Sequence, residues 1–290
     1  MNDKIIIGCV VVLYNPDYSI LHKVLSSAIT QTDALFIADN SYKDNSDFLL
    51  KNFDSVTYKK MSSNVGIAKA QNTGVLYFME NNFTHVILLD QDSIMAENLV
   101  PTLIKDMKSL SKIMQFGGIG PRPINRETNK KYLASINKGN LITTNITEVS
   151  ELISSGSLIP LKNFSDVGLL ENELFIDGVD HEWCWRAREA RGLRFFISEE
   201  ALLSHHLGEG DRFFVVRKVA IPTPFRTYYQ FRNYLILFRR SYVPIYWKLS
   251  NGFKFLIKFF YFPIFVKPRV DYLKNILNGI KDGILYKKVE

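Results

Sequence analysis

Apolar segments and helix-spaced segments alternate along the first 120 residues of this chain, and no other feature constrains its fold as strongly. Short runs of apolar, β-branched residues are separated by longer stretches in which apolar residues recur at helical spacing. This alternation predicts an α/β fold, with a mixed, mainly parallel sheet between helices. The predicted strands are residues 5–13, 34–39, 56–61, 85–90 and 115–120, and the predicted helices are residues 19–30, 67–81 and 99–112.

Three polar residues, Asn15, Asp39 and Asp90, each close one of these strands. Open α/β sheets bind their ligands at the carboxyl ends of the strands, so these residues should converge on one crevice. Beyond residue 120 we expect a smaller mixed sheet and acceptor-side loops over 121–170, with strand-like stretches at 132–136 and 152–161. A helix over 180–191, ended by Gly192, and a strand at 194–198 should follow.

The positive charge is concentrated at the C-terminal end. Residues 221–290 hold 13 Lys and Arg against 3 Asp and Glu, with 18 of the 38 aromatic residues, whereas residues 1–220 hold 23 against 26. Basic and aromatic side chains in one segment suit either nucleic acid or an anionic membrane surface. The net negative first part would repel a phosphate backbone, so we do not expect a nucleic-acid partner.

Two cysteines, Cys9 and Cys184, lie in apolar runs. So few cysteines are typical of a reducing compartment, and we expect a cytoplasmic protein. The N-terminal apolar run is too short to span a membrane and has no cleavage-site pattern, so we interpret it as the first strand.

Asp90, Gln91 and Asp92 follow the apolar run of residues 86–89. Alternate residues of an extended chain point the same way, so the two carboxylates can face one cation. Mg²⁺ and Mn²⁺ prefer oxygen ligands and typically take one or two carboxylates besides water and phosphate. The pattern predicts a metal site, and a solvated acidic turn is the alternative.

Two further clusters suit a nucleotide. Asn64 and Gly66 begin a predicted helix, whose exposed N–H groups favour an anion; the alternative is a helix cap with small residues chosen for packing. Asp39 opens a polar turn, where it would accept hydrogen bonds from a base or ribose, or cap the next helix.

Asp177, Asp180 and Glu182 crowd the start of the helix over 180–191. Neighbouring like charges raise one another's pKa, which suits a general base, although Asp180 capping this helix is the structural alternative. Two adjacent histidines, His205 and His206, follow the next strand and offer a metal ligand through one ring nitrogen.

Taken together, these motifs resemble the family-2 glycosyltransferases, in particular the bacterial rhamnosyltransferase branch of O-antigen and capsule synthesis. The resemblance covers residues 5 to 240. Its most specific part is Arg226-Thr227-Tyr228-Tyr229-Gln230-Phe231-Arg232-Asn233, which is similar to the branch motif Arg-x-Tyr-Tyr-x-x-Arg-Asn. It implies a GT-A (Rossmann-like) catalytic domain over 1–220, with a nucleotide-binding half over about 1–120 and an acceptor half over about 121–220, and a C-terminal helical segment over 221–290.

The resemblance also implies roles for single residues. Asp180 is implied as the catalytic base, but the family's Glu-Asp-x-Asp motif reads Val-Asp-His-Glu here, which leaves Asp177 and Glu182 as alternates. Asp92 and His205 are implied as metal ligands, with Asp90 nearby. Nucleotide-sugar contacts are implied for Tyr14, Asn15, Asp39, Ser41, Asn64, Gly66, Lys69, Asn72, Asp90, Gln91, Arg226 and Arg232.

The implied activity is a metal-dependent, inverting transfer of L-rhamnose from dTDP-L-rhamnose, with Mn²⁺ or Mg²⁺, to a saccharide or lipid-linked saccharide in surface polysaccharide synthesis. UDP-galactofuranose is the alternative donor, and a non-catalytic nucleotide-sugar-binding protein is the alternative of another class. Residues 240–290 are then expected to hold the protein on the inner face of the cell membrane, and a homodimer interface is the alternative. The side chains expected to face anionic lipid are Lys248, Lys254, Lys258, Lys267 and Arg269.

Overall fold

The computed structural model describes residues 4–111, 115–128, 130–131, 139–205, 212–214, 217–219 and 221–287. The predicted strand over 132–136, as well as His206, lies outside the described residues.

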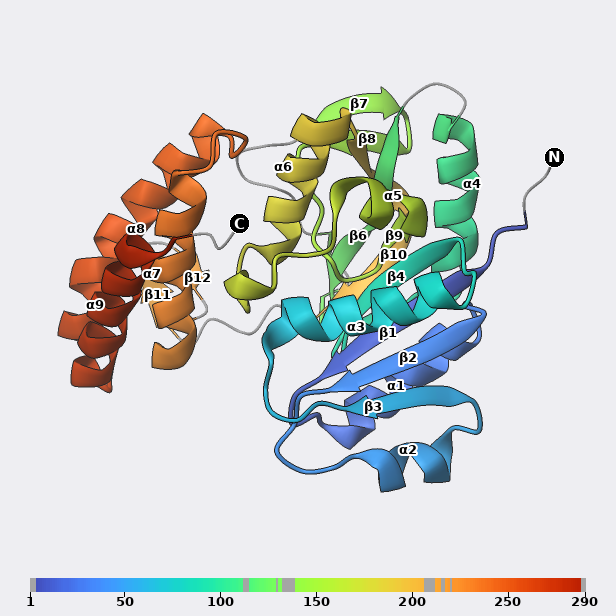
Figure 1. Cartoon of the computed structure of the whole chain (residues 1–290), viewed down its shortest axis with the longest axis horizontal. Helices are drawn as coiled ribbons and strands as arrows, with labels where there is room; N and C mark the ends of the chain where they lie inside the picture. The colour runs from blue at the N-terminus through green and yellow to red at the C-terminus, as the bar shows by residue number, and fades with distance from the viewer. Residues whose placement is uncertain are drawn as a thin grey trace.

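Four parallel strands form the first half of the sheet, in the order β3, β2, β1, β4 (Figure 1). These strands are β1 (Ile7–Leu13), β2 (Ala34–Asp39), β3 (Val56–Lys60) and β4 (His85–Asp90). Each lies within one or two residues of its predicted bounds, because a strand buried on both faces is a continuous apolar run that is visible in the sequence.

Helices cover both faces of this sheet, as predicted. Alternate residues of β1 point to opposite faces, so Val11 joins one apolar core and Val10 the other. The first core contains residues of α1 (Tyr18–Ile29) and α4 (Leu99–Ser111), and the second contains residues of α3 (Gly66–Glu80), α5 (Leu161–Val167) and α6 (Val179–Arg191). A short helix that was not predicted, α2 (Ser46–Asn52), follows β2.

The second half of the sheet corrects one prediction. The described strands within residues 121–170 do not form a separate smaller sheet, because they continue the main one, which has ten strands in the described part of the chain. The short strand β9 (Ser157–Pro160) runs antiparallel between β4 and β6 (Phe116–Asn125), and β6 pairs in parallel with β10 (Arg194–His205). The other edge of β10 pairs with β8 (Ile146–Val149) in its first part and with β5 (Ile94–Met95) in its last part. Strand β7 (Asn140–Thr143) pairs with β8 and ends the sheet. A separate hairpin joins β11 (Arg212–Phe214) and β12 (Arg217–Val219).

Helix α6 ends as predicted. Gly192 adopts a left-handed conformation with φ 64°, and its N–H donates to the Arg188 carbonyl at 2.8 Å. The strand that follows is longer than predicted, because β10 continues past Ser198 through a register shift to reach Arg122 and Pro123 of β6.

Three C-terminal helices lie side by side at one side of the molecule, beyond α6 (Figure 1). They are α7 (Pro224–Phe238), α8 (Ile245–Phe265) and α9 (Arg269–Leu285), and their shared core includes Phe231, Phe262 and Ile276. Trp247 of this group packs edge-on against Trp185 of α6, with ring centroids 5.1 Å apart. None of the helices in the described ranges has the length and apolar character needed to cross a membrane.

Gly74 lets α3 approach the sheet closely, because a Cβ at this position would lie 2.5 Å from a methyl carbon of Val10. We therefore expect Gly74→Ala to destabilise the protein by about 1–2 kcal/mol, since overpacking outweighs the roughly 1 kcal/mol gain in helix propensity. Denaturant unfolding measures the change. The control Leu76→Ala, on the exposed side of the same helix, should stay within about 0.5 kcal/mol of the wild type. A Gly74→Ala protein as stable as the wild type would contradict this account of the packing.

Candidate active site

The carboxyl ends of β1, β2 and β4 converge, as predicted. The Gln91 side-chain amide accepts from the Tyr14 backbone N–H at 2.8 Å and donates to the Tyr14 carbonyl at 3.2 Å, which ties β4 to β1. The backbone N–H of Asn15, at a φ of 47°, donates to the Ser41 hydroxyl at 2.8 Å, which ties β1 to β2. These contacts place the polar residues after three strands along one edge of the sheet.

Asp90, Asp92 and Asp180 form one acid cluster at this edge. Asp92 and Asp180 are far apart in the sequence, yet both charges act on the carboxyl group of Asp90. Two adjacent serines help to hold the cluster together: the Ser155 hydroxyl accepts from the Asp90 N–H at 3.1 Å, and the Ser154 N–H donates to the Asp180 carboxylate at 3.1 Å. The predicted metal motif and the predicted base therefore share one site.

Burial raises the pKa of Asp90 to about 7, and repulsion by Asp92 and Asp180 adds to this effect. A hydrogen bond with Ser155 and the positive charge of Arg226 act in the opposite direction, but they do not outweigh the first two causes. A site in which the carboxylates outnumber the nearby positive charges is suited to a cation.

The donors at this site fit Mg²⁺ or Mn²⁺, because Asp90 and Asp92 offer the hard carboxylate oxygens that these ions prefer. No group of three or more His, Cys, Asp or Glu side chains with metal-binding geometry occurs within the described ranges. The side chain of His205, the other predicted ligand, lies outside the described residues.

The two alternates for the catalytic base are engaged elsewhere. Glu182 is fully buried, and its carboxylate accepts from Arg186 at 2.8 Å and from the Tyr242 hydroxyl at 2.7 Å, so it does not face the cluster. Both oxygens of Asp177 accept from the guanidinium of Arg226, at distances of 2.7 to 3.1 Å. The carboxylate of Asp180, by contrast, accepts from the backbone N–H groups of Ser154 and His181.

Several residues predicted to contact the nucleotide instead bind other parts of the protein. Asp39 is fully buried, and its carboxylate accepts from Asn45 at 2.8 Å and Tyr58 at 2.7 Å. Burial raises the pKa of Asp39, but the hydrogen bonds from Ser41, Tyr58 and Asn45 outweigh it and leave that pKa below its ordinary value. The carboxylate therefore orders the turn after β2, and its contact with a base or ribose stays a prediction.

Three other residues predicted to contact the nucleotide also have hydrogen-bond partners within the protein. The side chain of Asn72 exchanges hydrogen bonds with the backbone of Leu170, that of Gln91 is paired with Tyr14, and that of Arg232 donates to the carbonyl of Glu173. Each polar group is thus used to join two segments of the chain.

The backbone N–H groups at the start of α3, the predicted anion site, have partners within the protein. The N–H groups of Ile67 and Ala68 point at the carbonyl of Phe175, which lies 2.7 Å and 3.5 Å away. Gly66, at a φ of 82°, is required because a Cβ would lie 2.6 Å from the Phe175 ring. The N–H of Gly66 is bonded to the Asn64 side chain at 3.1 Å. The helix start therefore docks a loop of the protein.

An exposed rim remains for a ligand. The hydroxyl groups of Tyr14 and Tyr42 lie 3.1 Å apart, and both rings are exposed beside the ends of β1 and β2. Lys69 is exposed on α3, and half of the Arg226 side chain is exposed. Because Arg226 also acts on the charge of Asp90, it lies near the acid cluster.

Sequence reasoning missed Tyr42, Ser154, Ser155 and Arg126. The Ser154-Ser155-Gly156 sequence before β9 is a turn signal, but nothing local shows that it meets two distant aspartates. Arg126 follows β6, and one of its terminal nitrogens donates to the Asp92 carbonyl, while its Nε has no hydrogen-bond partner among the described residues.

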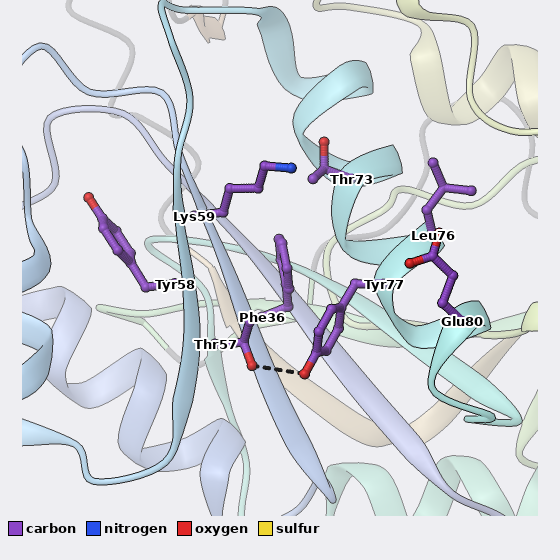
Figure 2. Close-up of a pocket in the computed structure, with 8 residues that line it drawn as sticks. All are labelled: Phe36, Thr57, Tyr58, Lys59, Thr73, Leu76, Tyr77 and Glu80. Atoms are coloured by element: carbon purple, nitrogen blue, oxygen red, sulfur yellow. Dashed lines mark hydrogen bonds between the residues drawn. The ribbon is translucent and has the colours of Figure 1, made fainter.

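A groove of about 480 Å³ between β3 and α3 is separate from this site (Figure 2). Its walls include Lys59, Thr73 and Tyr77, and the Thr57 and Tyr77 hydroxyls hydrogen-bond at 3.1 Å. No member of the acid cluster lines it, so the site rests on the strand ends and not on this groove.

The raised pKa of Asp90 has a measurable consequence. The folded state holds a proton that the unfolded chain releases above its ordinary pKa of 3.8, so this contribution to stability is lost as the pH rises through about 7. We expect the melting temperature of the wild type, relative to Asp90→Asn, to fall between about pH 4 and pH 7 in the presence of a chelator, and to change little above that range. A difference that does not change with pH would show that Asp90 is not perturbed.

Comparisons with known proteins agree with this arrangement. A sequence model described as glycosyl transferase family 2 matches residues 9–161, more than half of the chain. The dTDP-rhamnosyl transferase RfbF of Shigella flexneri is 29% identical over 286 residues, which cover 96% of this chain and 95% of the relative.

Two solved glycosyltransferase structures share the fold. The crystal structure of GalNAc-T7 with UDP, GalNAc and Mn²⁺ superposes with a TM-score of 0.60 at 14% identity, over 98% of this chain and 57% of that one. The crystal structure of S. aureus TarS superposes with a TM-score of 0.57 at 14% identity, over 97% and 49%. This chain therefore spans about half the length of either structure and has the GT-A fold. With the family model matched over residues that include β1, β4 and the Asp90 motif, the chain is a member of glycosyltransferase family 2.

Proposed function

We propose that the protein is an inverting rhamnosyltransferase that uses dTDP-L-rhamnose and a divalent cation. The observation that carries the proposal is the meeting of Asp90, Asp92 and Asp180 in one cluster at the carboxyl edge of the sheet. The proposed identity of the sugar and of the nucleotide rests on the similarity to the Shigella flexneri relative, which is named a dTDP-rhamnosyl transferase. UDP-galactofuranose is the alternative donor.

The reaction would be one displacement at the anomeric carbon. The acceptor oxygen bonds to that carbon as Asp180 takes the proton of the acceptor hydroxyl, and the bond from the carbon to the diphosphate breaks. A Mn²⁺ or Mg²⁺ ion held by Asp92 and Asp90 would neutralise charge on the departing diphosphate. The exposed guanidinium of Arg226 can assist with this charge, and Tyr14, Tyr42 and Asn64 would border the nucleotide.

A non-catalytic nucleotide-sugar-binding protein is the alternative of another class. Such a protein would use the exposed tyrosine rim, but it would not need a carboxylate oriented by two backbone N–H groups beside the metal motif. The division into a catalytic domain over 1–220, with its two halves, and a C-terminal segment over 221–290 belongs to the same proposal.

Asp180→Asn should lower the rate of dTDP release from dTDP-L-rhamnose, with water as the acceptor, by about 10²- to 10⁴-fold, because a general base is lost. Donor binding, followed as a thermal shift with Mn²⁺, should persist. Asp166→Asn, on α5 and paired with Lys162, is the control and should release dTDP at the wild-type rate. Near-full activity of Asp180→Asn would transfer the role of general base to Asp177. Release of UDP from UDP-galactofuranose, without release of dTDP from dTDP-L-rhamnose, would show that UDP-galactofuranose is the donor.

The C-terminal helices carry an apolar surface that suits the expected membrane contact. One face of α8 exposes side chains at intervals of three or four residues, each 52–66% exposed: Ile245, Leu249, Phe253, Leu256, Phe260 and Ile264. Helix α9 likewise exposes Val270, Leu273, Leu277 and Ile284. Contiguous exposed apolar rows of this kind are unusual unless they bind a partner or a membrane.

Only part of the predicted basic set can face lipid. Lys254, Lys267 and Arg269 are exposed. Lys248 donates to the Arg240 carbonyl at 2.8 Å, and Lys258 donates to Gln230 at 3.0 Å, so both turn toward the protein. Trp247 also packs inward, against Trp185. The proposed membrane contact thus depends on the exposed aliphatic and Phe side chains, together with these three cations. The protein would bind the inner face of the cell membrane and act there in surface polysaccharide synthesis.

We expect the protein to float with anionic lipid vesicles at low salt, and Phe253→Glu combined with Phe260→Glu to abolish flotation, because charged residues cannot enter the interface. Leu50→Glu, at a site on α2 that is 76% exposed, should float like the wild type. If the protein stays in the soluble fraction and sediments as a dimer that the double variant dissociates, the apolar face is a homodimer interface instead.

A further inference from the structure

The loop that precedes the proposed base has an unusual backbone. Phe175 has a φ of 61° and a ψ of −63°, and the Ile176 N–H donates to the Leu174 carbonyl at 2.6 Å, which is the geometry of a strained γ-turn. Asp177 and Gly178 follow with φ of 65° and 84°. Non-glycine residues in such conformations are strained, so the surrounding structure must hold them in place.

One side chain of α7 contacts three carbonyls of this loop. The buried amide nitrogen of Asn233 donates to the carbonyls of Leu174 and Ile176, each at 2.7 Å, and to that of Asp177 at 3.0 Å. Its amide oxygen accepts from Nε of Arg232 at 3.1 Å, which orients the amide so that the nitrogen faces the loop. Buried backbone carbonyls in an irregular loop need hydrogen-bond partners, and Asn233 supplies one for each of these three.

Other residues of α7 grip the same loop. Arg232 donates to the Glu173 carbonyl, and Arg226 binds the Asp177 carboxylate. The ring of Tyr229 stacks on Phe175, with centroids 4.5 Å apart and planes within 10°. On its other side the loop meets the start of α3, through the hydrogen bond from Ile67 to the Phe175 carbonyl.

The loop runs directly into α6, whose second residue is Asp180. The N–H of Glu182 donates to the Gly178 carbonyl, so the backbone at Gly178 sets where the first turn of α6 begins. A shift of the loop would therefore move Asp180 relative to Asp90 and Asp92. Displacement of a reacting group by about 1 Å can cost roughly 100-fold in rate.

We infer that Asn233 is a positioning residue: by holding the carbonyls of residues 174, 176 and 177, it sets the position of Asp180 in the acid cluster. The inference rests on the proposed function for the role of Asp180, but the clamp itself does not. It also assigns a task to the end of the Arg226–Asn233 motif, which lies outside the part of the chain that the family model matches.

The test compares Asn233→Ala with Asn163→Ala. Asn163 is a matched control, because it is also buried and its amide donates to two carbonyls, those of Phe116 and Gly117, but on β6 and away from the cluster. Both variants should lose thermal stability. Only Asn233→Ala should lower kcat for dTDP release from dTDP-L-rhamnose, by about 10- to 100-fold, while the donor KM stays within about threefold. Asn233→Ser keeps one donor and should fall between Asn233→Ala and the wild type.

Amide hydrogen exchange provides a readout that does not depend on activity. Exchange over residues 174–182 should accelerate in Asn233→Ala and not in Asn163→Ala. Unchanged exchange there would overturn the clamp, and faster exchange with a kcat equal to that of Asn163→Ala would overturn its link to Asp180. If Asn233→Ala does not fold, Asn233→Ser takes its place in both comparisons. An inactive wild type would instead refute the proposed function, whereas near-full activity of Asp180→Asn would transfer the role of base to Asp177 and overturn the link between the clamp and Asp180. In both cases the exchange result alone decides the clamp.

Discussion

The carboxyl group of Asp90 lies close enough to Asp92 and Asp180 for both charges to act on it, and the proposed site depends on this repulsion. Such a cluster is unfavourable in isolation, because the two neighbouring charges make the ionisation of Asp90 more difficult. It persists because β4 holds two of the acids at its end, while the loop before β9 joins Asp90 to Asp180 through Ser155 and Ser154. The same repulsion favours a divalent cation, and in the proposed function that cation would in turn hold the diphosphate.

The C-terminal helices are part of this site as well as a separate layer. Helix α7 holds the strained loop before Asp180 through Asn233, Arg232 and Arg226, and Tyr242, which follows α7, donates to the buried Glu182 of α6. The loop in turn caps the start of α3 through the Phe175 carbonyl. The loop before Asp180 thus connects the edge of the sheet and the proposed base to the C-terminal helices, whose outer faces are apolar. An acceptor bound at a membrane surface would therefore lie next to the proposed base.

The fold was largely predictable, and the site only in part. The bounds of β2 and β4 match their predictions, and α6 ends at Gly192 as expected, because apolar periodicity and a glycine C-cap act over a few residues. The insertion of β9 between β4 and β6 was not foreseen, since a four-residue strand carries little periodic signal and its antiparallel pairing joins segments distant in the chain. Residue type likewise marked Asp39, Asn72, Glu182 and Arg232 as polar groups of interest, but the structure gives each of them hydrogen-bond partners within the protein.

The sequence alone determined three features: a sheet covered by helices, acids at the end of a central strand, and a basic, aromatic C-terminal segment. Each of them follows from a local pattern of apolar and charged residues. Only the tertiary structure decided that Asp180 acts on the charge of Asp90, that Glu182 is paired with Arg186 and Asp177 with Arg226, and that Lys248 and Lys258 turn inward while a row of aliphatic and Phe side chains turns outward. The physical reason is that a charged side chain takes its role from the partners that long-range packing brings to it, and a sequence does not display those partners.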